Sequence, residues 1–203
     1  MNIKSLPKLY TDLLTKLEVE HIKQIVPSLG NHWSMYNSTV GKDYDPEFTE
    51  DDRVVDTPSG VYFFYSDNKN WKHEPNQFLI RYGKKIAEQV AKDLNLKIKQ
   101  YIRMKVNVLF NDCNVKQGQF NAPHKDTKNP NTISLIYYVD DCDGDTVVFT
   151  DFNKDAKTLG EPKRFPPVCG NVLALESMMY HASSNPTNYN RRFVINVVFE
   201  YEE

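Results

Sequence analysis

Cysteine is scarce in this chain and long apolar runs are missing. These two shortages argue against a disulfide-rich protein, a zinc-knuckle protein and a membrane-spanning protein. The three cysteines, Cys113, Cys142 and Cys169, are odd in number, far apart and form no Cys-x-x-Cys pair. We therefore expect neither a disulfide framework nor a structural zinc knuckle, and we expect a reducing compartment, the cytoplasm. No stretch approaches the roughly 18 consecutive apolar residues of a membrane span. The first residues, MNIKSLPKLYTDLL, lack the apolar segment of a signal peptide.

A strong net charge is missing as well. The formal charge is −2 over 203 residues, so no overall field recruits nucleic acid or an anionic membrane. One local basic stretch, KIKQYIRMK (97–105), keeps a nucleic-acid partner open without indicating one. Charges that alternate along a strand are more typical of a solvated face than of a phosphate track. Nothing in the sequence indicates an oligomeric state.

The length and composition predict one folded domain over residues 1–203. Hydrophobic residues make up 40% and aromatic residues 12% of the chain, which argues against disorder. We expect residues 1–98 to form a part of helices and loops that packs on a β-rich core of residues 99–203. The sequence shows no internal repeat and no low-complexity tract.

The first part of the chain contains two helix patterns. In LTKLEVEHIKQIV (14–26) the apolar residues recur at helical spacing, Thr15 and Glu18 are placed as a capping box, and Pro27 ends the segment. NQFLIRYGKKIAEQVAKDLNL (76–96) carries one apolar stripe, which is expected to pack on a sheet. VYFFY (61–65) is a strand candidate.

Residues 31–60 are polar and interrupted by prolines, and we interpret them as one long loop. Loops of this length in compact domains are often functional lids. Trp33, Tyr36 and Tyr44 either pack this loop onto the core or close it over a substrate.

From about residue 100 the apolar period changes to two, which is the period of β-strands. Because no helix-length pattern intervenes, a parallel βαβ sheet is disfavoured, and an antiparallel sandwich or barrel is indicated. The fold class is therefore mainly β with flanking helices. The strand-like runs are YIRMKVNVLF (101–110), TISLIYYV (132–139), TVVFT (146–150), NVLAL (171–175) and RRFVINVVFEY (191–201).

His124 and Asp126 form a His-x-Asp pair in the polar stretch NAPHKDTKNP (121–130). Residues i and i+2 of a strand face the same way, so this pair could present an imidazole and a carboxylate to one metal ion. Chance alone gives roughly 0.7 such pairs in a chain of this composition. By itself the pair is more typical of a solvated loop.

Three later features add to this pair. His181 follows a strand-like run, and Arg192 begins one face of the last strand, although Arg191 and Arg192 both fit an arginine that reaches solvent. Tyr138 lies within an apolar strand, where its hydroxyl needs a buried partner. The acidic DDCDGD (140–145) lacks the spacing of a calcium loop, so we interpret it as a hairpin turn.

Taken in order, these segments resemble the 2-oxoglutarate- and Fe(II)-dependent dioxygenases. The resemblance is to the prolyl-4-hydroxylase-like branch and to its phage-encoded relatives, and it covers about the last hundred residues. It is carried by GQFNAPHKD (118–126), SLIYYVDD (134–141), GDTVVF (144–149), CGNVLALES (169–177), YHASSN (180–185) and RRFVINVVF (191–199).

The resemblance implies a double-stranded β-helix, a jelly-roll barrel of the cupin kind. It also implies that His124, Asp126 and His181 ligate Fe(II), which leaves positions for 2-oxoglutarate and O2. Arg192 would bind the distal carboxylate of 2-oxoglutarate, with which its planar guanidinium pairs in a bidentate manner. Tyr138 would donate to the same carboxylate, Ile136 and Thr146 would line the pocket, and ascorbate is a candidate reductant.

Two departures from the family pattern stand out. Asp143-Gly144 replaces the usual Gly-Gly before the threonine, which matters little if only Gly144 needs a positive φ. The segment VNVLFND (106–112) before His-x-Asp has no tyrosine to contact the cosubstrate, and Asn107 is the candidate substitute. Arg191 stays the alternative to Arg192.

The resemblance implies hydroxylation of a C–H bond with release of succinate and CO2. The expected substrate is a peptidyl residue of the prolyl type or an amino acid, so the expected partner is a protein, a peptide or a small molecule. Nucleic acid and small metabolites stay open as substrates, and a phage-encoded protein would lie in the host cytoplasm. The alternatives are a metal protein of the same fold that does not use 2-oxoglutarate, a non-catalytic β-barrel that binds a partner, and a zinc hydrolase.

Overall fold

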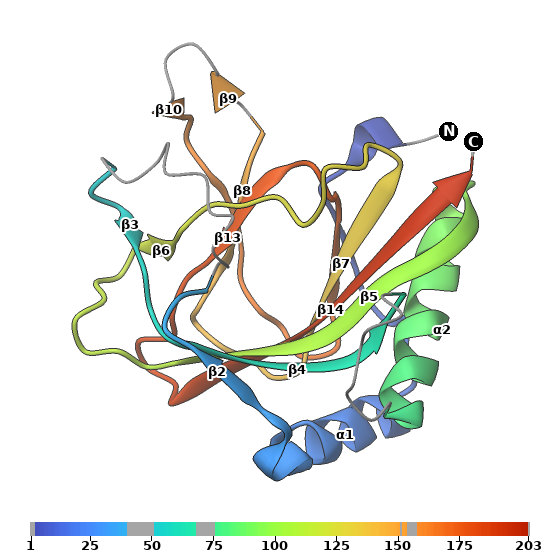
Figure 1. Cartoon of the computed structure of the whole chain (residues 1–203), viewed down its shortest axis with the longest axis horizontal. Coiled ribbons are helices and arrows are strands. Elements are labelled where there is room, and N and C mark those ends of the chain that lie inside the picture. Colours follow the sequence, from blue (N-terminus) through green and yellow to red (C-terminus); the bar gives the residue numbers. More distant parts are fainter. Residues whose placement is uncertain (1–2, 40–50, 68–75, 151, 154–157, 203) are drawn as a thin grey trace.

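Strand β14 (Arg191–Glu202) runs through the middle of a seven-stranded antiparallel sheet, and nearly all of its residues are buried. The computed structural model describes residues 3–39, 51–67, 76–150, 152–153 and 158–202. The sheet order is β1–β12–β7–β14–β5–β4–β2, and Figure 1 labels its strands β7, β14, β5, β4 and β2. The other strands are β1 (Lys8–Tyr10), β12 (Val172–Glu176), β7 (Thr132–Tyr138), β5 (Lys97–Phe110), β4 (Ser59–Ser66) and β2 (Ser34–Tyr36).

A second, three-stranded sheet packs on the inner face of the large one. It has the order β11–β8–β13 and consists of β11 (Lys163–Phe165), β8 (Thr146–Phe149) and β13 (Tyr180–Ser183). Ile136 and Val194 of the large sheet lie in one apolar cluster with Val148 and Phe165 of the small sheet. Two short pairs complete the strands: β3 (Val54–Val55) with β6 (Phe120–Asn121), and β9 (Phe152–Asn153) with β10 (Thr158–Leu159).

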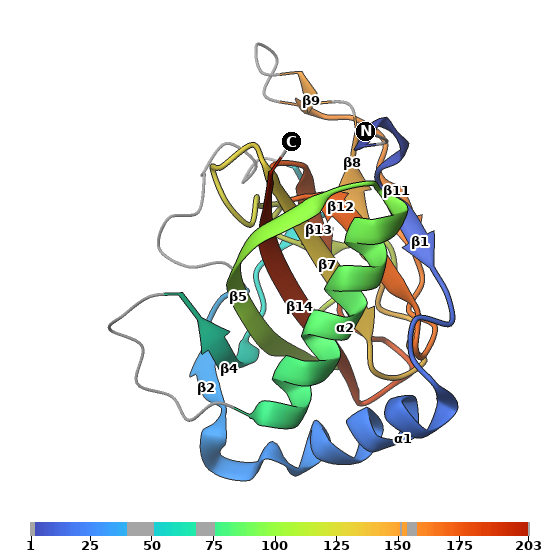
Figure 2. The ribbon, with the colours of Figure 1, turned by 90° about the vertical axis from the view of Figure 1, so that its right-hand side faces the viewer.

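Helices α1 (Lys16–Ile25) and α2 (Gln77–Asp93) cover the outer face of the large sheet (Figure 2). Leu79, Ile86 and Val90 of α2 share the main apolar core with Val197 and Phe199 of β14. Two 3-10 turns, η1 (Ile3–Ser5) and η2 (Pro27–His32), flank this helical layer in the chain. Neither helix in the described part of the chain is long and apolar enough to span a membrane.

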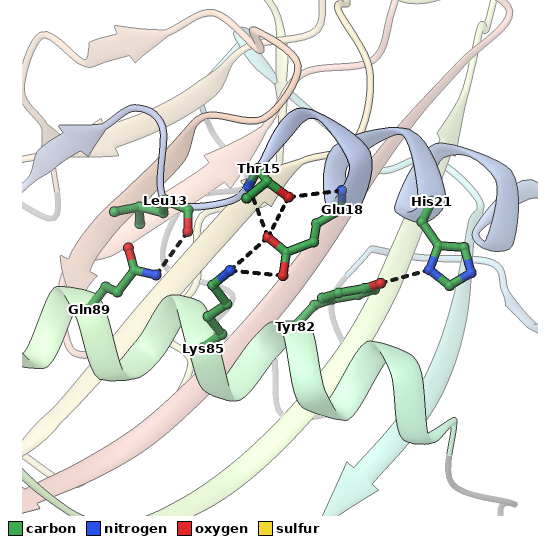
Figure 3. A network of polar contacts seen from close by, with 7 residues as sticks. All are labelled: Leu13, Thr15, Glu18, His21, Tyr82, Lys85 and Gln89. Atoms are coloured by element: carbon green, nitrogen blue, oxygen red, sulfur yellow. Dashed lines mark hydrogen bonds and ion pairs between the residues drawn. The ribbon is translucent and has the colours of Figure 1, made fainter.

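The two helices are joined by polar contacts that run along their interface (Figure 3). Thr15 caps α1 and forms the predicted capping box with Glu18. Lys85 on α2 donates to the same carboxylate, with Nζ 2.7 Å from Glu18 Oε2. Tyr82 Oη lies 2.7 Å from Nδ1 of His21, further along α1. The cap of α1 is therefore also a contact between the helices.

Most predicted elements are confirmed, and two predictions are wrong. Residues 31–60 are not one loop, because β2 and β3 lie within them and pair with β4 and β6. Trp33 packs on Phe193 with ring centroids 5.8 Å apart, Tyr36 is largely exposed, and Tyr44 lies outside the described residues. Residues 140–145 are not a hairpin turn, because the strands on either side, β7 and β8, belong to different sheets.

We expect Thr15→Ala to lower the free energy of unfolding by about 1 kcal/mol, the usual cost of losing an N-cap side chain. Thr15→Ser, which keeps the capping oxygen, should stay close to wild type. The change would be measured from urea denaturation midpoints with the slopes compared. Equal midpoints for the alanine and serine variants would show that the cap contributes nothing.

Candidate metal centre

His124 and His181 face each other where the two sheets meet. His181 belongs to β13, and His124 joins it through an isolated antiparallel bridge. The His124 amide donates to the His181 carbonyl at 2.9 Å, and the His181 amide donates to the His124 carbonyl at 3.0 Å. Asp126, two residues on, donates its amide to the Ser177 carbonyl at 2.9 Å. The backbone thus fixes all three residues on one side of the site.

The side chains of these residues converge. Ligand atoms of His124, Asp126 and His181 all lie within 4.8 Å of one another. His181 Nε2 is 3.6 Å from Asp126 Oδ2, and the two imidazole centroids are 4.6 Å apart. Two nitrogens and a carboxylate oxygen at this spacing form a mixed donor set that suits iron, manganese or zinc.

Both imidazoles are oriented by backbone carbonyls. Nδ1 of His181 lies 3.0 Å from the Met179 carbonyl, and Nδ1 of His124 lies 3.3 Å from the Ala122 carbonyl. A carbonyl oxygen can only accept, so each Nδ1 carries the proton and each Nε2 keeps its lone pair. A carbonyl on the second ring nitrogen is the usual way in which proteins orient a metal-binding histidine.

Three donors hold the Asp126 carboxylate. Arg103 NH2 reaches Oδ1 at 2.5 Å, while Ser134 Oγ and Asn196 Nδ2 donate to Oδ2 at 2.6 and 3.2 Å. Ser134 Oγ also accepts a hydrogen bond from the Ser177 hydroxyl at 2.8 Å, since its own proton goes to Asp126, and this links it to the backbone partner of Asp126. The carboxylate is therefore fixed in orientation by strands β5, β7 and β14 together.

Burial and neighbouring charges set the protonation states of Asp126 and His124. Burial acts to raise the pKa of Asp126, but the charges of Arg103 and of the two histidines outweigh it, so the pKa is lowered. Burial, and then the neighbouring His181, lower the pKa of His124 to about 3. An ionised carboxylate beside a neutral imidazole is the protonation state in which both groups bind a metal.

These groups open into a cavity of about 60 Å³, room for several water molecules at about 10–15 Å³ each. Four of the sequence-predicted residues besides the triad line it: Ile136, Thr146, Asn107 and Arg192. Tyr138 is fully buried behind this lining, and its hydroxyl donates to Thr146 Oγ1 at 3.0 Å. Burial raises the pKa of Tyr138 to about 12, so its hydroxyl keeps its proton.

Arg192, and not Arg191, reaches the cavity. Arg192 is 3% exposed and donates from NH2 to Thr146 Oγ1 at 2.7 Å. Arg191 is exposed on the other face of β14, over the Phe193 ring. Gly144 makes room for Arg192, because a Cβ there would lie 2.6 Å from the Ser184 carbonyl and 3.0 Å from Arg192 Cδ. Its φ is not positive, so the glycine is needed for this close approach and not for its turn.

Buried polar atoms without a partner gather around this cavity. In the described part of the chain six such side-chain atoms occur, and four of them belong to residues that line the cavity. An unpartnered buried polar group costs about 1–3 kcal/mol, so groups gathered in this way indicate a polar ligand. The four atoms are Thr39 Oγ1, Asn107 Oδ1, Arg192 Nε and Asn196 Oδ1.

Two residues of β5 that reach the candidate site were not predicted from the sequence. The basic stretch 97–105 is a solvated face only at its start, where Lys97 and Lys99 pair with Glu202 and Glu200. Arg103 contacts Asp126, and Lys105 lines the cavity. Arg103, Lys105 and Asn107 are alternate residues of one strand and so face the same side of the sheet. This spacing could have predicted that Arg103 and Lys105 face the cavity with Asn107.

No protein-family model matches the sequence, and no curated protein matches it either. Solved structures do match. An oxidoreductase of the 2OG-Fe(II) oxygenase family from Burkholderia pseudomallei has a TM-score of 0.69 at 12% identity, over 98% of this chain and 87% of that one. A prolyl hydroxylase from Trichoplax adhaerens, in complex with a peptide fragment of the hypoxia inducible factor oxygen degradation domain, scores 0.61 at 15% identity, over 98% and 85%. A Pseudomonas putida prolyl-4-hydroxylase scores 0.56 at 13% identity, over 96% and 92%.

The fold is therefore that of the 2-oxoglutarate/Fe(II) oxygenases, prolyl hydroxylases among them, and the predicted jelly-roll barrel is confirmed. The His-Asp-His cluster lies inside this fold. The similarity to phage-encoded relatives stays a prediction.

We expect His124→Ala and His181→Ala to lower the affinity for Mn(II) by more than the roughly 10–100-fold that the loss of an outer-sphere partner costs. Ser134→Ala, which removes one donor from Asp126, should fall within that range. Equilibrium dialysis would measure all three variants. His21→Ala, on α1, is the matched control and should bind Mn(II) like wild type; retention of wild-type affinity in both His124→Ala and His181→Ala would exclude this metal site.

Proposed function

We propose that this protein is an Fe(II)- and 2-oxoglutarate-dependent dioxygenase that hydroxylates a C–H bond. The observation that carries the proposal is the pairing of a His-Asp-His cluster with an incompletely satisfied buried arginine in one cavity. Either feature alone fits several metal proteins. Together they match a ligand that chelates a metal at one end and presents a carboxylate at the other.

His124, Asp126 and His181 would hold Fe(II), and Arg192 would bind the distal carboxylate of 2-oxoglutarate. Thr146 would assist Arg192, since its hydroxyl already accepts from the guanidinium and from Tyr138. Tyr138 would then act through Thr146, because it does not line the cavity. Ile136 would supply an apolar wall, and the free Asn107 oxygen would accept a hydrogen bond from a bound group or water.

Bound Fe(II) and 2-oxoglutarate would supply the activation of O2. Overall, the substrate C–H bond becomes C–OH and takes one oxygen atom of O2. The other atom enters succinate as 2-oxoglutarate loses CO2, so the electrons balance without a further reductant. The chain itself would orient the cosubstrate, keep bulk water out and hold a substrate C–H bond against the metal.

The proposed substrate is a peptidyl residue of the prolyl type or an amino acid. The Trichoplax adhaerens enzyme with its bound peptide supports a peptide. We also propose that residues 1–203 act as one domain, since β1 and β4 from the N-terminal part pair with β12 and β5. A cytoplasmic location is supported by the three cysteines, all of which are free.

Succinate formation from 2-oxoglutarate tests the activity. The purified protein should release succinate only when Fe(II) and O2 are both supplied, and His181→Ala should abolish the release. Metal binding without any release of succinate would instead support a non-catalytic metal-binding barrel. Release by a Zn(II)-loaded protein without Fe(II) would contradict the proposal.

Arg192→Ala should raise the Kd for 2-oxoglutarate at least about 30-fold, because a buried charge pair that loses one partner typically costs 2–5 kcal/mol. Isothermal titration of the Mn(II)-loaded protein would measure the Kd. Arg191→Ala, one residue away and on the opposite face of β14, is the control and should leave the Kd within about twofold. The reverse result would assign the anchor to Arg191.

A further inference from the structure

We propose that Lys105 binds a carboxylate of the substrate, so that the protein oxidises a small molecule with a free carboxylate, such as an amino acid, and not an internal residue of a peptide. This inference rests on the proposed function. It concerns a side chain that the metal cluster and the 2-oxoglutarate anchor leave unused.

Lys105 is a cation in the cavity wall that forms no ion pair within the described part of the chain. Its side chain extends from the inner face of β5 opposite Asn196 of β14 and lines the cavity with His124, Asp126 and His181. The ammonium makes no hydrogen bond or ion pair with any residue in the described ranges; the Phe63 ring centroid lies 6.0 Å from Nζ. Burial lowers the pKa of Lys105 to about 8, so the amine is held at a cost that a bound anion would offset.

Lys105 and Arg192 lie at different ends of the cavity. Lys105 pairs with Asn196 of β14, which lies four residues along that strand from Arg192. Four residues of strand span about 13 Å, so Lys105 and Arg192 project from the sheet at positions about 13 Å apart along β14. The charge of Lys105 acts on His124 and Asp126, whereas that of Arg192 acts on Tyr138, Cys142 and Asp145. Lys105 therefore belongs to the metal end.

The distal carboxylate of one 2-oxoglutarate molecule would bind Arg192 at one end of the cavity, and its other carboxylate would bind the metal. Four C–C bonds join its two carboxyl carbons, which reach at most about 6 Å. When a molecule of this length binds Arg192 and chelates the metal, neither of its carboxylates is left to bind Lys105. Lys105 is then left facing the remaining open side of the metal, where a substrate would lie.

The charges of the site support an anionic substrate. Asp126 is the only carboxylate among the residues that line the cavity, whereas Lys105 at the metal end and Arg192 at the other end are cationic, as is Arg103, which contacts Asp126 from outside the lining. A divalent metal and a doubly charged cosubstrate cancel, which leaves about two uncompensated positive charges in a part-buried site. Asp145, near Arg192, is already 3.5 Å from Arg164 and does not change this balance. A substrate carboxylate would reduce the imbalance within reach of the metal.

The experiment uses the standard L-amino acids, each as the free acid and as its carboxamide, with capped peptides that contain an internal proline as the competing class. Succinate release is measured with Fe(II), 2-oxoglutarate and O2. At least one free acid should raise the release about tenfold above the rate without substrate, and its amide should not.

Lys105→Met should raise the KM for that acid at least about 30-fold. Lys105→Arg keeps the positive charge, so its KM should lie close to the wild-type value. The Kd for 2-oxoglutarate in the Mn(II)-loaded protein should shift much less in Lys105→Met than the KM does. Methionine has a similar length and no charge, so the variant should fold. Lys99→Met, at the exposed start of β5 where Lys99 pairs with Glu200, is the control for loss of a lysine charge on this strand and should leave the KM unchanged.

Each other outcome has a distinct meaning. Equal stimulation by acids and amides, stimulation by capped peptides alone, or stimulation by no free acid would overturn the assignment of Lys105. A parallel loss of 2-oxoglutarate affinity in Lys105→Met would assign the lysine to the cosubstrate instead. If the wild-type protein neither binds 2-oxoglutarate nor releases succinate, the dioxygenase proposal itself fails.

Discussion

The strict alternation of side chains along β14 is the constraint on which both the core and the site depend. Phe193, Ile195, Val197 and Phe199 point to the helices, and Arg192, Val194 and Asn196 point to the cavity. Each fully buried apolar side chain contributes about 1.5–3 kcal/mol, whereas a polar group in its place would cost a similar amount. A slip of one residue would exchange the two faces. The packing of the helices thus sets which side chains reach the candidate metal site.

The apolar faces of this architecture were predictable from sequence because they are periodic. The period-two runs located β5, β7, β8, β12 and β14, and the capping box of Thr15 and Glu18 located the start of α1 within a residue. The same parity placed Arg192 rather than Arg191 inside. The resemblance to the oxygenases, and not periodicity, supplied the topology and brought His124, Asp126 and His181 together.

What the sequence could not provide is pairing between strands. Residues 140–145 looked like a hairpin turn because the strands around them are adjacent in the chain, yet they carry the chain from one sheet to the other. The contact of Arg103 with Asp126 joins β5 to the segment after β6 and has no local signature. Gly144 was explained by its turn, whereas its function depends on Ser184 and Arg192, which lie far along the chain. All three features depend on contacts between residues far apart in the chain, which secondary-structure propensities do not predict.

The reciprocal backbone bonds between His124 and His181 have a consequence for how the protein would take up and lose a metal. Both histidines are held by N–H···O bonds that do not involve their imidazoles, and Asp126 is held by Ser177 in the same way. The ligands are thus preorganised, and little conformational entropy has to be given up when a cation enters. A bound metal would then add to the stability of a fold whose backbone bonds do not depend on it, whereas in a zinc finger the metal nucleates the fold.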